Sequence, residues 1–140
     1  DVHTVLDAGE SVLPPGSRLA TAVREARSLA GLDLDAALDE LHAAHRDLHW
    51  VHVINNAALV AFALAHGQGD FGRSICAAVT GGWDTDSDGA TVGAVVGALT
   101  GAGGLPARWI DPLRNRLATS IASFDGIGFD ELADRTVALL

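Results

Sequence analysis

Glycine recurs at every fourth position in one apolar segment: Gly89, Gly93, Gly97 and Gly101. Residues four apart lie on the same face of an α-helix, so these glycines would form one smooth face of a helix over about 90–99. Each interior glycine costs up to about 1 kcal/mol relative to alanine, so the repeat needs a physical reason. The spacing predicts close packing against a second helix; close approach of a ligand is the alternative.

The rest of the chain also favours helices. Apolar residues make up 49% of the 140 residues and aromatic residues only 5%, a balance more typical of helices than of a β-sandwich. Capping residues, glycine and proline predict helices that end before residue 14 and that span about 18–30, 50–66, 71–79 and 130–139, with further helices from residue 33 or 35 and from residue 112. No strand-like alternation occurs. The sequence therefore predicts a single all-α unit over residues 1–140.

Charge and composition exclude several kinds of partner. The net charge is −9 and all nine basic residues are arginines, so a duplex nucleic acid is a poor partner. No apolar run approaches the roughly 18–20 residues that cross a bilayer, so no membrane partner is expected. Cys76 is the single cysteine. It is expected in the core, and the absence of a second cysteine favours a cytoplasmic location.

An acid-rich segment precedes the glycine repeat. Residues 81–89 read GGWDTDSDG, and residues 84–88 are called the acid turn below. Asp84, Asp86 and Ser87 offer oxygen atoms of the kind that bind Mg²⁺, Mn²⁺ or Ca²⁺. The alternative is an acidic cap at the start of the next helix, with Ser87 or an aspartate as the cap and the other carboxylates solvated. An EF-hand is excluded, because the twelfth loop position is Val95 instead of glutamate.

This segment resembles the signature of the ADP-ribosylglycohydrolase family. The likeness runs from Gly81 through Ala98 and continues in the Leu105–Trp109 element, LPARW; a proline turn at residues 13–19 extends it over nearly the whole chain. The resemblance implies an all-α, compact orthogonal helix bundle around two magnesium ions, with Mn²⁺ as an alternative metal.

The resemblance also implies roles for individual residues. Asp84, Asp86 and Ser87 match metal ligands, and the two aspartates would act in catalysis through the metal. The positions implied for substrate binding are Gly82, Trp83, His52 and Asn55. For His52 and Asn55 the alternative is a helix cap or a buried polar network. Trp83 stands where family members commonly have aspartate or a small residue.

Two further elements of the family pattern do not occur in this sequence. They are an N-terminal G-D-x-x-G region and a T-D-D-like cluster, which carry the family's other metal ligands. We therefore expect the chain to be the C-terminal part of a larger domain, completed by its own N-terminal remainder or by a complementing chain. The resemblance implies a hydrolase that cleaves an ADP-ribosyl bond in a small molecule or protein. A non-catalytic ADP-ribose-binding or metal-binding protein of the same fold is the alternative.

Four histidines follow helical spacing: His42, His45, His49 and His52. On one continuous helix they would form a stripe, and histidines four apart can share a zinc ion. The alternative is that they are surface or pocket-wall residues, because Arg46 and Asp47 lie where a loop is expected.

Overall fold

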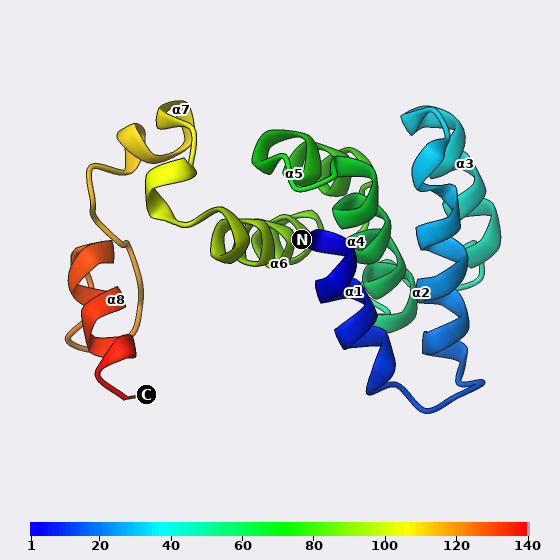
Figure 1. Ribbon diagram of the computed structural model, residues 1–140, viewed down its shortest axis with the longest axis horizontal. Helices are drawn as coiled ribbons and strands as arrows, with labels where there is room; N and C mark the ends of the chain where they lie inside the picture. Colours follow the sequence, from blue (N-terminus) through cyan, green and yellow to red (C-terminus); the bar gives the residue numbers. More distant parts are fainter. Residues whose placement is uncertain (140) are drawn as a thin grey trace. The chain divides into compact units, whose positions relative to one another are not determined.

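The computed structural model describes residues 1–139, in which the regular elements are helices and no strand occurs (Figure 1). The all-α class is therefore confirmed. The α-helices are α1 (Val2–Ser11), α2 (Arg18–Ser28), α3 (Leu34–His45), α4 (Val53–Gly67), α5 (Phe71–Thr80), α6 (Thr85–Thr100), α7 (Ala107–Ile110) and α8 (Phe129–Val137). Single 3-10 turns occupy Leu29–Gly31, Ala102–Gly104 and Asp111–Leu113.

Polar side chains define where several of these helices begin. The Ser17 hydroxyl accepts the amide proton of Ala20, and Asp33 and Asp70 cap α3 and α5 in the same manner. The predicted starts of α2, α3 and α5 are therefore confirmed. The helix expected from residue 50 begins later, at Val53, because the His52 ring accepts the amide proton of Ile54 and caps α4 there.

The chain forms two compact units, residues 1–103 and residues from 104 onward. At the boundary, helix α6 ends at Thr100, its C-cap Gly101 has a positive φ of 73°, and a short turn rich in glycine follows.

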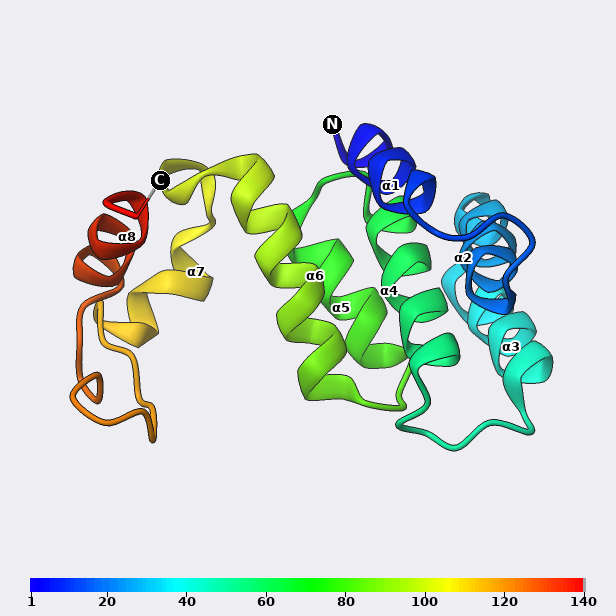
Figure 2. The same ribbon diagram turned by 90° about the horizontal axis from the view of Figure 1, so that it is seen from below.

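Helix α4 runs through the middle of the first unit, between α5 and α6 on one side and α2 and α3 on the other (Figures 1 and 2). It is buried on both sides. One core cluster joins its residues to α1, α5 and α6, and a second joins them to α2 and α3. Phe62 and Leu59 of α4 are fully buried in the second cluster.

The glycine face of α6 packs against α5, as predicted. A Cβ atom added at Gly89 would lie 3.2 Å from Val79, and one at Gly93 would lie 3.3 Å from Ile75. At Gly97 it would meet Phe71 at 3.8 Å. The partners are four residues apart on α5 and run in the opposite order, so the two helices are antiparallel and glycine allows their close approach.

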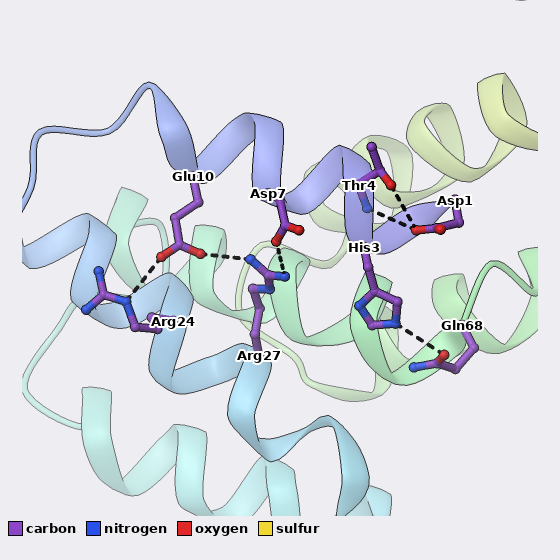
Figure 3. Close-up of polar contacts among 8 residues, drawn as sticks. All are labelled: Asp1, His3, Thr4, Asp7, Glu10, Arg24, Arg27 and Gln68. Atoms are coloured by element: carbon purple, nitrogen blue, oxygen red, sulfur yellow. Dashed lines mark hydrogen bonds and ion pairs between the residues drawn. The ribbon is translucent and has the colours of Figure 1, made fainter.

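An arginine of α2 anchors α1 (Figure 3). The Arg27 guanidinium donates to Asp7 at 2.6 Å and to Glu10 at 2.8 Å, and Arg24 donates to the other oxygen of Glu10 at 3.1 Å. These bonds raise the pKa of Arg27 above its usual value, with the bond to Asp7 as the largest cause. Arg27 is therefore the main polar link between α1 and α2.

Arg27→Met should reduce the free energy of unfolding by about 1 kcal/mol, because two charge-assisted bonds of a partly buried guanidinium are lost while the apolar stem is kept. The measurement is urea denaturation at low salt and at 1 M NaCl. The loss should shrink at high salt, which screens the ion pairs. The control is Arg24→Met, which removes a single bond from a more exposed side chain and should have a smaller effect. Equal losses at both salt concentrations would contradict the assignment.

In the second unit, polar contacts join residues that are distant in the sequence. Asn115 donates to the Asp130 carboxylate at 2.7 Å and accepts from the Asp130 amide at 3.3 Å. The bond from Asn115 to the carboxylate is the largest cause that lowers the pKa of Asp130. The helix predicted from Pro112 is wrong: only one 3-10 turn forms, because Arg114 and Asn115 adopt left-handed backbone conformations.

The last helix begins two residues earlier than the predicted cap at Asp130 implies. Gly128 is the N-cap of α8, and Asp130 lies in its first turn, where its carboxylate accepts from the amide of Glu131 at 2.8 Å. Residues 121–128 form turns and no helix, and Gly126 has φ of 78°.

Two expectations about surface and solvent can be compared with the structure. Cys76 is exposed, so its predicted place in the core is wrong; the inward face of α5 is formed by smaller residues that include Ala77 and Ala78. None of the helices in residues 1–139 has both the length and the apolar character that a bilayer crossing requires.

Candidate functional site

The acid turn belongs to a helix. Helix α6 begins at Thr85, five residues before the predicted start, so Asp86 and Asp88 lie in its first turn. The N-cap is Asp84, and the suggested capping role of Ser87 is therefore wrong. The partial positive charge at a helix N-terminus stabilises carboxylates placed there, which explains why a sequence rich in turn-forming residues is helical at this point.

Asp84 occupies the cap position without capping through its side chain. The cap residues of the other long helices in the first unit all accept a backbone amide proton: Asp1, Ser17, Asp33, His52 and Asp70. The Asp84 carboxylate is thus free for another partner. Asp84 therefore takes the position that the acidic-cap alternative describes, but its carboxylate makes no capping bond.

A side chain of α4 holds the backbone of Asp84. The Asn56 amide oxygen accepts the Asp84 amide proton at 3.2 Å. The Asn56 amide group in turn donates to the carbonyl oxygens of Trp50 at 2.7 Å and His52 at 2.9 Å. Asn56 therefore connects the acid turn to the start of α4. Sequence reasoning did not predict this role, because it depends on two segments 28 residues apart.

The residues before Asp84 adopt unusual backbone conformations. Gly82 has φ of 80° and Trp83 has φ of 52°, both in the left-handed region. A residue with a side chain pays roughly 1–2 kcal/mol for this conformation, so surrounding contacts must hold Trp83 in place. Gly81, which precedes Gly82, is buried, and a Cβ atom added at Gly81 would clash with the Leu59 side chain. The turn is therefore fixed by close packing against α4.

Asp88 is the buried carboxylate of the acid turn. It is 4% exposed, and its Oδ2 atom accepts no hydrogen bond. Burial raises the pKa of Asp88 to about 6, and repulsion from the Asp84 and Asp86 carboxylates adds to the shift. Asp88 lies four residues after Asp84, and residues four apart share one face of a helix. If the start of α6 had been predicted at Thr85, the sequence would have indicated that these two carboxylates are neighbours.

Asp88→Asn should stabilise the metal-free protein at neutral pH. Because the pKa of Asp88 is raised in the folded state, the group costs no stability below about pH 4; the cost grows as pH rises from about 4 to 6 and is complete above 6. We expect the variant to gain on the order of 1–2 kcal/mol at pH 7.5 and nothing at pH 4. Urea denaturation with a chelator present measures both values. An equal difference at the two pH values would contradict the raised pKa.

The other residues implied for substrate binding are distributed around the start of α4 and the turn before α6. His52 caps α4, and Gly82 and Trp83 are half-buried. Asn55 is fully buried: its amide group lies 3.4 Å from the carbonyl oxygen of Trp50, and its Oδ1 atom accepts no hydrogen bond. Their contacts with substrate stay predictions.

The histidine stripe is broken. His42 and His45 lie on α3, His49 lies in the following loop, and His52 is the N-cap of α4. Within residues 1–139 no group of three or more histidine, cysteine, aspartate or glutamate side chains is arranged to hold a metal ion. The acid turn can therefore supply only part of the coordination shell of an ion.

The donor chemistry of the acid turn nevertheless fits a hard cation. Asp84 does not use its carboxylate as a cap, Asp86 and Ser87 are exposed, and Asp88 has a buried oxygen without a partner. These neighbouring carboxylates repel one another, and a bound cation would relieve that repulsion.

The fold and this site together define an all-α protein with a carboxylate-rich turn suited to a hard metal ion. The ADP-ribosylglycohydrolase family model matches residues 1–140. The chain therefore belongs to the ADP-ribosylglycohydrolase family. No curated protein and no solved structure matches it.

Proposed function

We propose that this protein is a magnesium-dependent hydrolase that cleaves an N- or O-glycosidic ADP-ribosyl bond, with this chain supplying half of a dinuclear metal site. Family membership supports the glycohydrolase class. The observation that carries the metal assignment is the Asp84 carboxylate, which stands at the start of α6 without capping it.

Asp84, Asp86 and Ser87 would hold the metal, and Mn²⁺ could replace Mg²⁺ there. When bound, the metal would orient the substrate and activate a water molecule for attack at the anomeric carbon. Asn56 keeps the Asp84 backbone in place, and the positive end of α6 favours the ionised carboxylates. The remaining ligands would come from the N-terminal remainder of the protein or from a complementing chain. The proposal includes a cytoplasmic location.

Release of ADP-ribose tests this proposal. The protein is incubated with an ADP-ribosylated arginine and with an ADP-ribosylated serine peptide, first with Mg²⁺ and then after EDTA treatment. We expect release of at least one conjugate with Mg²⁺, loss of release after EDTA, and recovery when Mg²⁺ is restored. Release that EDTA does not change would contradict the metal-dependent mechanism.

The alternative is a non-catalytic protein of the same fold that binds ADP-ribose or a metal. The buried, unpaired oxygen of Asp88 suits ion binding whether or not a bond is cleaved. Saturable binding of ADP-ribose by calorimetry, with no release from either conjugate, would favour this alternative.

A further inference from the structure

Trp83 contacts two histidines of α3. The His42 ring stacks on the indole with ring centroids 4.5 Å apart and an angle of 30° between the planes. The His45 ring meets the indole edge-on at 6.1 Å and 67°. Trp83 also packs against the core cluster formed by α2, α3 and α4. These contacts explain how a tryptophan is kept in a left-handed backbone conformation directly before Asp84.

His42 makes a second contact with the same turn. Its Nε2 atom lies 2.7 Å from the carbonyl oxygen of Gly81. A carbonyl oxygen only accepts, so Nε2 carries a proton and donates it. One side chain therefore binds both the backbone of Gly81 and the ring of Trp83.

The segment between Gly81 and Asp84 is thus fixed at both ends. His42 of α3 holds its beginning, Leu59 of α4 packs against Gly81, and Asn56 of α4 accepts the amide proton of Asp84. The direction in which the Asp84 carboxylate leaves the backbone depends on this segment. A change at its beginning would alter the position of that carboxylate without removing it.

We propose that His42 is a positioning residue for the candidate cation site. It sets the conformation of residues 81–84 through Gly81 and Trp83, and so presents Asp84 to the ion without touching the ion itself. The proposal rests on the proposed function, because it assumes that Asp84 binds a metal. It also gives Trp83 an anchoring role, since His42 covers one face of the indole ring.

The test compares His42→Ala and His42→Gln with Glu40→Ala, an exposed site on the same helix. Calorimetry measures Mn²⁺ affinity, and hydrogen exchange in metal-free protein follows the amides of Gly82 and Asp84, which bond Val79 and Asn56. We expect His42→Ala to weaken Mn²⁺ binding by about tenfold to a hundredfold, as for other residues that orient a ligand. Exchange of both amides should become faster.

His42→Gln should recover part of both properties, because its amide group can still donate to Gly81, and Glu40→Ala should change neither. Urea denaturation of each variant separates a local change from a loss of the whole fold. Unchanged Mn²⁺ affinity in His42→Ala would overturn the positioning role and leave the proposed function standing. Absence of Mn²⁺ binding by the unmodified protein would overturn the proposed function, and the positioning role with it.

Discussion

Asp84→Asn is expected to slow ADP-ribose release by roughly a thousandfold, with the fold intact. Metal ions stabilise a transition state by several kcal/mol, and each 1.4 kcal/mol corresponds to about tenfold in rate. Asparagine keeps the size of the side chain and can occupy an N-cap position, so stability should change little. The rate of release under saturating Mg²⁺ measures the effect.

The matched control for this prediction is Asp134→Asn, which neutralises an exposed carboxylate on α8. It should release ADP-ribose at the unmodified rate. A thermal unfolding profile of Asp84→Asn that matches the unmodified protein would show that the loss is chemical. Full activity of Asp84→Asn would mean that its carboxylate takes no part in the reaction.

Phe62→Ala should reduce the free energy of unfolding by about 3–5 kcal/mol. The Phe62 side chain is fully buried in the cluster shared by α2, α3 and α4, and the centroids of the Phe62 and His66 rings lie 5.2 Å apart. Removing it leaves a cavity at the centre of the unit. Small domains are stabilised by only about 5–15 kcal/mol, so the variant should be close to unfolding at 37 °C.

Urea denaturation measures this loss, with Val53→Ala as the control on the same helix. Val53 is 65% exposed at the start of α4, so its substitution should cost less than about 0.5 kcal/mol. A cost below about 1 kcal/mol for Phe62→Ala would contradict the central place of α4 in the core.

Local chemistry explains the parts of the fold that the sequence predicts well. Ser17 and Asp70 cap helices by bonding backbone amides three residues away. The glycine repeat of α6 lies within one segment, so its close packing against another helix can be predicted from that segment alone. The false helix after Pro112 has the opposite cause. There Asn115 forms hydrogen bonds with Asp130, which lies 15 residues away in the sequence, so local patterns do not reveal this contact.

The candidate site is less predictable for the same reason. The sequence identifies Asp84, Asp86 and Ser87 as a group, because they are adjacent and match a known pattern. The burial of Asp88 and the contact of His42 with Gly81 arise only when α3, α4 and α6 come together. Supporting residues of this kind lie far from the acid turn in sequence, and no local pattern marks them.

Calorimetric titration with MgCl₂ and with MnCl₂ tests the central claim most directly, namely that the carboxylates of Asp84 and Asp86 bind a divalent cation. The account predicts saturable binding to the unmodified protein, loss of that binding in Asp86→Asn, and unchanged binding in Asp134→Asn. No saturable binding by the unmodified protein, or equal affinity in Asp86→Asn, would contradict it.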